Sequence, residues 1–239
     1  MWKFEGGVAA CIGLVALCAF APPTCAQQST VTAIDILLDP DAAMIARAEA
    51  ANARLLKAFP KGFSLDAEHR PHITLLQRFV RTADLDKVYA AADKTLAGVK
   101  ITDWKLTAIK YYFVGAPPIG LAGIVIAPTD DLLRLQQELL DAVAPFTVGT
   151  GTAEAFFTLP GEPEINAGVI PYVAGFVPDH TGKNYSPHVS VGVGTIDTLD
   201  KMLAEPFDAF TFSPVSASIY QLGDFGTARK KLGDLTVKP

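Results

Sequence analysis

Two short stretches of this 239-residue sequence repeat one pattern: proline, histidine, an aliphatic residue, a hydroxyl residue and a second aliphatic residue. The first stretch runs from Pro71 to Leu75 and the second from Pro187 to Val191. A pattern that recurs in similar surroundings indicates internal duplication, which constrains a fold more than any single element does. We call His72–Leu75 the first motif and His188–Val191 the second motif.

The segments around the two motifs follow a common order of strand, helix and strand. Short β-rich apolar runs predict strands, and apolar residues spaced by three or four predict helices. The first half predicts strands at 31–38, 72–80 and 101–113, a helix at 41–58, and a second helix that Thr82 caps and Gly98 ends. The second half predicts strands at 121–127, 188–193, 210–221 and 232–237, and helices capped by Thr129 and Thr195. The pattern predicts an α+β fold of duplicated strand–helix units, with pseudo-twofold lobes at roughly 31–115 and 119–239.

The two halves differ mainly between residues 145 and 187. Several glycines and prolines interrupt the strand alternation there, and residues 166–176 are compatible with a short helix. A connection of this length inside a domain is usually a functional lid or a disordered loop. Because the segment leads directly into the second motif, we favour a lid at 145–187.

The first 26 residues differ from the rest and predict a secretory signal peptide. Lys3 precedes an uncharged apolar run at 8–21 that is too short to span a bilayer, and small residues follow up to Ala26. The alternatives are a buried N-terminal helix or, with cleavage before Cys25, a lipid anchor. Cleavage after Ala26 would remove every cysteine and leave a periplasmic or secreted domain, residues 27–239, that has no thiol chemistry.

Charge and hydropathy limit the partners of the chain. The formal net charge is −5, and no basic stripe that could follow a long nucleic acid is present. Beyond the first 26 residues, no stretch of the sequence is long and apolar enough for a membrane span. We therefore expect a small anionic partner, which a few local donors can hold.

Strand geometry explains the spacing inside each motif, because successive side chains point to opposite faces of a sheet. The aliphatic residues are expected in the core, and each histidine shares the other face with a hydroxyl residue: His72 with Thr74, and His188 with Ser190. If the two faces meet across a cleft, two imidazoles and two hydroxyls surround one point. Histidine titrates at about pH 6.5, so one ring can accept a proton while the other donates one.

Residues next to the motifs add candidates for ligand contacts. Arg78 falls on the face of His72 and Thr74 by parity, where it could assist a phosphate or lie solvated at the rim. Gly192 and Gly194 either leave room for a ligand beside the second motif or ease close packing.

Aromatic residues and the other histidines complete the candidate set. Tyr112 and Tyr185 could stack on a nucleobase, with ordinary packing as the alternative. His69 and His180 are predicted to be surface residues. No third ligand stands at a spacing that suits a metal, so the sequence predicts neither a metal nor another cofactor.

The paired motifs resemble those of the two-histidine (2H) phosphoesterase superfamily, which includes bacterial 2′-5′ RNA ligase-like proteins and cyclic phosphodiesterases. The resemblance includes the Tyr185-Ser186-Pro187 approach to the second motif and the late Ile219-Tyr220-Gln221 strand. It covers nearly all of residues 27–239. It implies a bilobal fold with antiparallel sheets lining a central cleft, and metal-independent action on 2′,3′-cyclic phosphates or 2′-5′ linkages.

Carried onto this sequence, the resemblance implies that His72 and His188 form the acid–base pair and that Thr74 and Ser190 hold the phosphate. The substrate would be a small nucleotide or a short RNA phosphodiester. A catalytically weak nucleotide- or oligonucleotide-binding protein using the same cleft is one alternative, and a 2′-5′ RNA ligase is another. The near-symmetry of the motifs leaves the acid and base roles interchangeable at this stage.

Overall fold

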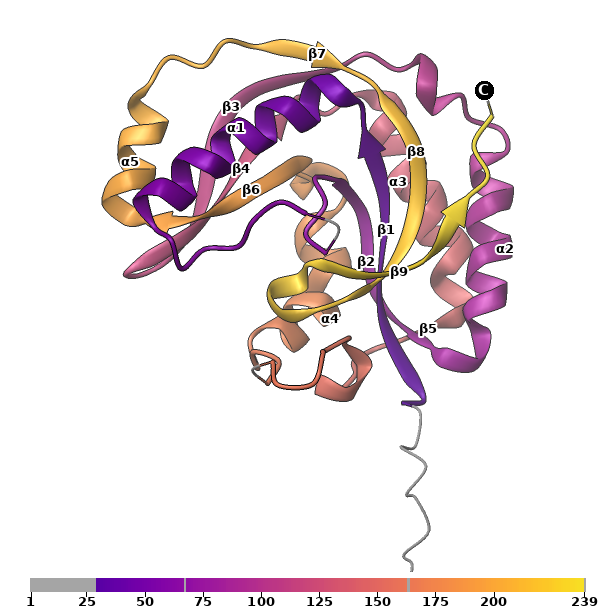
Figure 1. Ribbon diagram of the computed structural model, residues 1–239. Helices are drawn as coiled ribbons and strands as arrows, with labels where there is room; N and C mark the ends of the chain where they lie inside the picture. The colour runs from indigo at the N-terminus through magenta and orange to yellow at the C-terminus, as the bar shows by residue number, and fades with distance from the viewer. Residues whose placement is uncertain (1–28, 67, 163, 239) are drawn as a thin grey trace, which may run out of the picture.

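The computed structural model describes residues 29–66, 68–162 and 164–238, so the predicted signal peptide at 1–26 lies outside the described residues. The strands form two sheets, which we call sheet A and sheet B, and every neighbouring pair is antiparallel (Figure 1). Sheet A has the order β5 (Thr147–Val148), β2 (Ile73–Arg81), β1 (Val31–Pro40), β8 (Pro214–Leu222) and β9 (Ala228–Leu235). Sheet B has the order β6 (His188–Thr195), β4 (Ile119–Ile126), β3 (Leu106–Ala116) and β7 (Phe210–Phe212). The predicted α+β fold with antiparallel sheets is confirmed.

The two sheets are built alike, although neither comes from one half of the sequence. In each sheet the strand with the motif, β2 or β6, pairs with the strand that opens its own half, β1 or β4. The C-terminal strands β8 and β9 then join sheet A, and β3 joins sheet B. The proposed lobe boundary at 115–119 therefore falls inside a hairpin, in which Ala116 of β3 pairs with Ile119 of β4.

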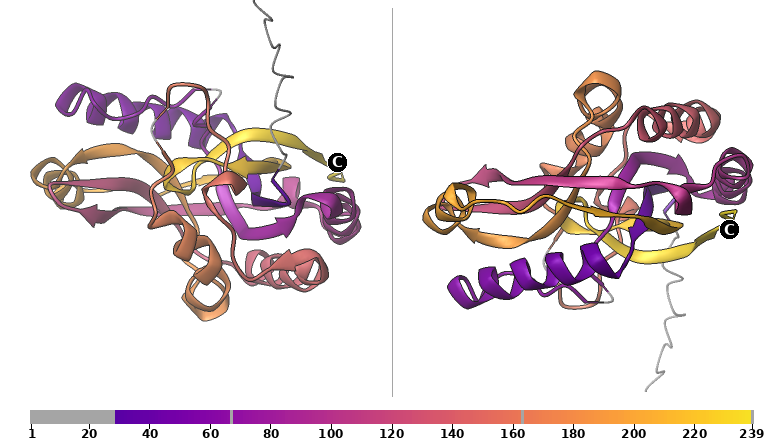
Figure 2. Two further views of the ribbon diagram at one scale, coloured as in Figure 1. Left: turned by 90° about the horizontal axis from the view of Figure 1, so that it is seen from below. Right: turned by 90° about the horizontal axis from the view of Figure 1, so that it is seen from above.

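The long helices are exchanged between the sheets. The helix α1 (Ala42–Ala58) follows β1 of sheet A but packs on β6 of sheet B, where Leu55 lies close to Gly192 and Gly194. The helix α3 (Asp130–Val143) follows β4 of sheet B but packs on sheet A beside α2 (Leu85–Leu96). Figure 2 shows the strands in the middle of the molecule, with α1 on one side and α3 on the other.

The threonine N-caps predicted from the sequence are confirmed with one exception. Thr129 and Thr195 cap α3 and α5 (Ile196–Ala204) with their hydroxyls, as predicted. Thr82 does not cap α2, because its hydroxyl donates to the carbonyl of Ser29 at 2.7 Å and a single 3-10 turn separates it from the helix. The strand predicted from residue 101 begins at 106, because residues 101–103 form another 3-10 turn that buries Ile101.

Within the segment 145–187, residues 155–156 and 165–173 pack on one face of sheet A, whereas β5 forms the edge strand of that sheet. The helix predicted within 166–176 is present as α4 (Val169–His180), which extends to residue 180. Residues of the segment form a second hydrophobic core with sheet A, made of Ala155, Phe156, Ile165, Val169 and Val173 against Ala33, Phe79 and Leu222. The described part of the segment is thus a packed layer, and its opening as a lid stays a prediction.

Candidate functional site

A β-bulge interrupts β2 directly after the hydroxyl residue of the first motif. Thr74 pairs with Leu37 of β1, but Leu76 pairs with the next residue, Ile36, which leaves Leu75 as the extra residue. Leu75 and Leu76 are both fully buried as a result. The predicted alternation of core and motif faces is therefore confirmed through residue 75 and reversed beyond it.

The bulge corrects the prediction for Arg78. Past the bulge, Gln77 rather than Arg78 returns to the face of Thr74, and the Gln77 amide nitrogen donates to Asp35 at 3.0 Å. Arg78 points to the opposite face, where its guanidinium donates to the Thr147 hydroxyl at 3.0 Å. Strand parity failed here because a period of two holds only in a regular ladder.

The second motif contains a bulge at the same position. Ser190 pairs with Gly123 of β4 and Gly192 pairs with Ala122, so Val191 is the extra residue. Gly192 consequently faces α1, where a Cβ atom would lie 2.8 Å from the Asn52 amide nitrogen, and its φ of 140° favours glycine. The glycines therefore allow close helix packing, which was the second of the two alternatives for these residues.

An amide side chain from the exchanged helix supports each bulge. The Asn52 amide nitrogen of α1 donates to the Val191 carbonyl at 2.9 Å, and the Gln136 amide nitrogen of α3 donates to the Leu75 carbonyl at 3.0 Å. Their amide oxygens accept from Leu65, which precedes the first motif, and from Gly182, which precedes the second. Each helix thus ties the bulge of one motif to the approach of the other. Sequence reasoning missed both residues, and their signal was a polar residue on an otherwise apolar helix face.

Both histidines are held by the same backbone contact. The Nδ1 atom of His72 lies 2.7 Å from the Arg70 carbonyl oxygen, and Nδ1 of His188 lies 2.8 Å from the Ser186 carbonyl oxygen. Because a carbonyl oxygen can only accept, Nδ1 carries a hydrogen in both rings. This assignment leaves Nε2 of each ring to accept a proton when the ring is neutral and to donate one when it is charged.

The structure brings the two motifs together. The Tyr185 hydroxyl donates to the Thr74 carbonyl at 2.7 Å, which joins the approach of the second motif to the first. Burial lowers the pKa of His188, and the nearby positive charges of His72 and His180 lower it further. Tyr185 is buried and its hydroxyl is engaged, so it braces the motifs, which corrects its predicted role as a base-stacking residue.

Aromatic side chains surround the second motif. The Tyr112 ring lies 4.9 Å from the His188 ring, with an interplanar angle of 63°. Gly123 makes this contact possible, because a Cβ atom there would lie 2.5 Å from the Tyr112 ring. Tyr112 therefore lies beside the second motif, and its stacking on a base stays a prediction.

The helix α4 contributes a histidine that the sequence analysis assigned to the surface. His180 packs against the rings of Tyr172 and Phe176, with centroid distances of 4.9 and 5.7 Å. Burial, together with the negative charge of Asp35, raises the pKa of Tyr172 to about 12. His180 and Tyr172 therefore border the site. His69, in contrast, stacks on Phe63 at 4.9 Å in the loop before the first motif.

Asp35 is the functional candidate that the sequence analysis missed. It lies in the middle of β1, 0% exposed, and its Oδ2 atom accepts from the Thr74 hydroxyl at 2.8 Å and from Gln77. His72 Nε2 lies 3.7 Å from the same oxygen, and Oδ1 has no hydrogen-bond partner among the described residues. Burial raises the pKa of Asp35 to about 6, although the charge of His72 and the two donors oppose the shift. A carboxylate between two isoleucines of an apolar strand was the signal that could have found it.

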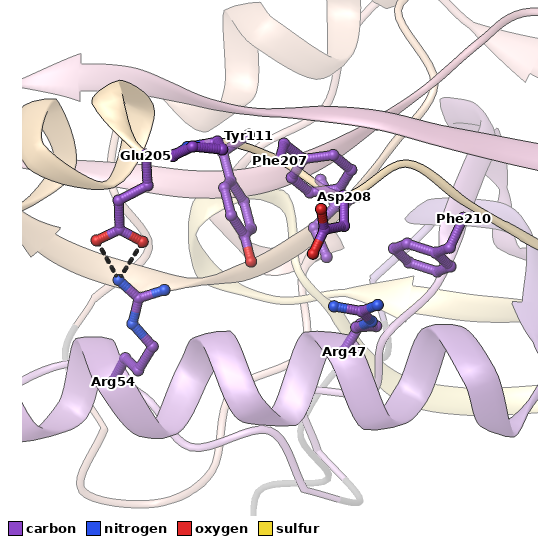
Figure 3. Close-up of a pocket in the computed structure, with 9 residues that line it drawn as sticks. Arg47, Arg54, Tyr111, Glu205, Phe207, Asp208 and Phe210 are labelled. Carbon is purple, nitrogen blue, oxygen red and sulfur yellow. Dashed lines mark hydrogen bonds and ion pairs between the residues drawn. The ribbon is translucent and has the colours of Figure 1, made fainter.

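A separate hollow of about 160 Å³ lies on the other face of sheet B, between α1 and the segment before β7 (Figure 3). Arg54 forms an ion pair with Glu205 at 2.6 Å, and the Arg47 guanidinium lies 5.1 Å from the Phe210 ring centroid. Figure 3 shows the Tyr111 side chain pointing toward α1 between these two arginines. These contacts fasten the segment before β7 to α1, and neither motif histidine lines the hollow.

Two features are absent from residues 29–66, 68–162 and 164–238. No helix there is long and apolar enough to cross a membrane. No group of three or more His, Cys, Asp or Glu side chains in the same ranges is arranged to hold a metal ion.

Comparison with known proteins places the fold. The sequence matches no protein-family model and no curated protein. The crystal structure of TT0787 from Thermus thermophilus is 16% identical, with a TM-score of 0.50 over 87% of this chain and 100% of that chain. E. coli LigT complexed with NADP+ is 12% identical (TM-score 0.42, 87% and 99% covered), and Kluyveromyces marxianus Usb1 is 10% identical (TM-score 0.40, 86% and 99% covered). At these identities the likeness concerns the fold alone: this chain has a fold similar to that of TT0787 along most of its length.

Proposed function

We propose that this chain is a phosphodiesterase of the 2H type, which opens 2′,3′-cyclic nucleotide phosphates or 2′-5′ linkages by paired-histidine acid–base catalysis without a metal. One observation carries the proposal: two histidines in matching bulged strands, each with Nδ1 fixed by a backbone carbonyl and Nε2 left for proton transfer. The resemblance of the two motifs to that superfamily supports the substrate class.

The asymmetry of the site assigns the two roles for hydrolysis. The lowered pKa of His188 favours a neutral ring near pH 7, which suits a base. His72, whose Nε2 lies 3.7 Å from Asp35 Oδ2, takes the complementary role of the acid. Water attacks phosphorus and gives its proton to His188 Nε2, while the bond to the ribose oxygen breaks and that oxygen takes the proton of His72 Nε2. The product is a phosphate monoester with a free ribose hydroxyl.

Turnover of a panel of 2′,3′-cyclic nucleotides in the presence of a chelator tests this function. We expect His72→Ala and His188→Ala each to lower kcat/KM by about a hundredfold or more, the usual scale of acid–base catalysis. His69→Ala is the matched control, because that ring stacks on Phe63 outside the motifs and its removal should leave turnover within about twofold.

The outcomes separate the alternatives. Turnover retained in either motif variant would remove the mechanism, and loss of turnover with the chelator would remove its metal independence. Tight nucleotide binding without turnover would favour the binding-protein alternative, and joining of cyclic-phosphate and hydroxyl ends would favour the ligase.

We further propose a periplasmic or secreted location. Mass spectrometry of the mature N-terminus would test it, and a chain that still begins at residue 1 would be the contrary result.

A further inference from the structure

We propose that Asp35 controls whether the Thr74 hydroxyl can bind a phosphoryl group, so that ligand binding at the first motif takes up a proton at Asp35. Asp35 would be a positioning residue that acts through Thr74. The identity of the ligand as a phosphoryl group rests on the proposed function, whereas the coupling rests on contacts within the site.

A hydroxyl group has a single hydrogen to donate. Thr74 donates that hydrogen to Asp35 Oδ2 at 2.8 Å. An ionised carboxylate can only accept, so this direction is fixed as long as Asp35 is charged. Thr74 therefore has no hydrogen left for an anion, and it would present only lone pairs to a phosphoryl oxygen.

A proton on Asp35 reverses the contact. Asp35 takes the proton from solvent, its carboxyl O–H then donates to Thr74 Oγ1, and the Thr74 hydrogen turns to the phosphoryl oxygen. The Gln77 amide can keep its hydrogen bond to Oδ2, because a carboxylic acid oxygen still has a lone pair. No bond between heavy atoms forms or breaks in this step.

The surroundings of Asp35 make the neutral form accessible near physiological pH. The side chain is completely buried, and among the described residues Oδ1 lacks a partner, both of which disfavour the charged form. Of the groups that face it, His72 at the start of β2 opposes protonation by its positive charge, and the hydroxyls of Tyr172 in α4 and Tyr185 before β6 are neutral. An arriving anion adds negative charge next to Asp35 and so favours proton uptake.

The second motif does not have this arrangement. The register position that Asp35 and Gln77 occupy in sheet A is occupied in sheet B by the pair Leu121 and Val193. Gly123, which pairs with Ser190, has no side chain that could accept from the Ser190 hydroxyl. The proton coupling is therefore expected from one motif only.

Sulfate binding to the whole protein tests the coupling, because the charge of sulfate stays constant while Asp35 titrates. In Asp35→Leu, which installs the residue found at the equivalent place in sheet B, the Thr74 hydroxyl is free at every pH. We expect this variant to bind sulfate about fivefold or more tightly than the unmodified protein at about pH 8, and the ratio to fall toward one at about pH 5.

The Thr74→Val substitution distinguishes an effect of the hydroxyl on sulfate affinity from an effect of simple charge repulsion. Removal of a negative charge strengthens anion binding in any background, whereas the hydroxyl effect requires Thr74. Asp35→Leu is expected to strengthen sulfate binding at about pH 8. We expect most of this increase in affinity to disappear when Thr74→Val is also present, and to persist when Ser190→Ala is also present. An equal gain with and without Thr74 would overturn the proposal, as would a failure of the unmodified protein to bind sulfate at low pH.

Calorimetry in buffers of different ionisation enthalpy provides a second measurement that needs no substitution at Asp35. Sulfate binding at about pH 7.5 should take up about half a proton more in the unmodified protein than in Thr74→Val, which retains the same histidines and carboxyl group. Equal proton uptake would overturn the inference. Turnover of cyclic nucleotides is not needed for either test, so a protein that hydrolyses none of them could still show the coupling, and an active enzyme could still lack it.

Discussion

The two motif regions agree in their backbone and differ in their neighbours. Each has a bulge after the hydroxyl residue, a histidine Nδ1 fixed by a carbonyl, and a bulge carbonyl bound by an amide from the exchanged helix. Around the first motif, Asp35 and Gln77 form a buried polar pair. Around the second, Leu121 and Val193 take that position and Tyr112 contacts the histidine.

This difference teaches that a duplicated motif does not imply a duplicated environment. Two groups that matter for proton affinity lie outside both motifs: His180 in α4, which lowers the pKa of His188, and Asp35 in β1, whose own pKa is raised by burial. A carboxylate oxygen of Asp35 lies 3.7 Å from the His72 ring, whereas burial and the charges of His72 and His180 lower the pKa of His188. The acid and base roles that we propose therefore rest on the neighbours of the motifs, since the motifs alone leave the two roles interchangeable.

The largest expected effect concerns stability and the carboxylate found only at the first motif. The pKa of Asp35 is about 6 in the fold against 3.8 ordinarily, so the folded protein binds this proton more tightly than the unfolded chain does. The favourable contribution is complete below about pH 4 and is lost as the pH rises through about 6. A shift of about two units corresponds to about 3 kcal/mol.

The unmodified protein should therefore lose stability relative to Asp35→Leu as the pH rises. The unfolding free energy of Asp35→Leu minus that of the unmodified protein should increase by about 3 kcal/mol between about pH 4 and about pH 7.5. Urea unfolding at a series of pH values measures this difference, in which titrations common to both proteins cancel. A difference that changes in the opposite direction would mean that the ion pair with His72 outweighs burial.

The two amide supports should be equivalent, which probes what the motif regions share. Asn52→Ala and Gln136→Ala each leave a bulge carbonyl without its donor, and we expect each to cost about 2 kcal/mol of unfolding free energy. Denaturant unfolding at one pH measures both. If only one substitution destabilises the fold, the bulges are not equivalent supports.

Gly123→Ala should affect the second motif through Tyr112. A Cβ atom at residue 123 would overlap the Tyr112 ring at 2.5 Å and move that ring away from His188. We expect kcat/KM for cyclic nucleotides to fall about tenfold in the fraction of the protein that is folded. Gly149→Ala is the matched control, since a Cβ atom there meets nothing within 4 Å. Unchanged kinetics in Gly123→Ala would show that the contact between Tyr112 and His188 is dispensable.

The smallest expected effect comes from Arg78. Because the bulge turns the Arg78 side chain away from Thr74, Arg78→Ala should leave kcat/KM within about twofold of the unmodified protein. Gln77→Ala removes a donor to Asp35 and should lower kcat/KM more than Arg78→Ala does. Steady-state kinetics of the two variants provide the comparison. A loss greater than about tenfold in Arg78→Ala would restore the phosphate contact that strand parity predicts.

The sequence predicted what depends on local order along the chain. Alternation of side chains placed His72 with Thr74, and capping chemistry placed the starts of α3 and α5. The bulges were not predictable, because the sequence around Leu75 and Val191 still reads as a regular strand. The missed register change moved Arg78 to the wrong face.

Long-range pairing was beyond the sequence for a different reason. Asp35 became part of the site because β1 pairs with β2 in one register, and nothing in either strand alone specifies that register. The exchange of α1 and α3 between the sheets depends likewise on three-dimensional packing. The residues of each motif could be predicted from the sequence, but the charged and polar groups around them could not.

The amide supports also have a consequence for how the molecule opens. Asn52 joins Leu65, on the way to the first motif, to Val191 in the second, and Gln136 makes the converse link between Leu75 and Gly182. A local fluctuation that detaches one helix must therefore disturb both motifs. In native-state hydrogen exchange, the amides around the two histidines should exchange as one cooperative unit, with a shared opening free energy.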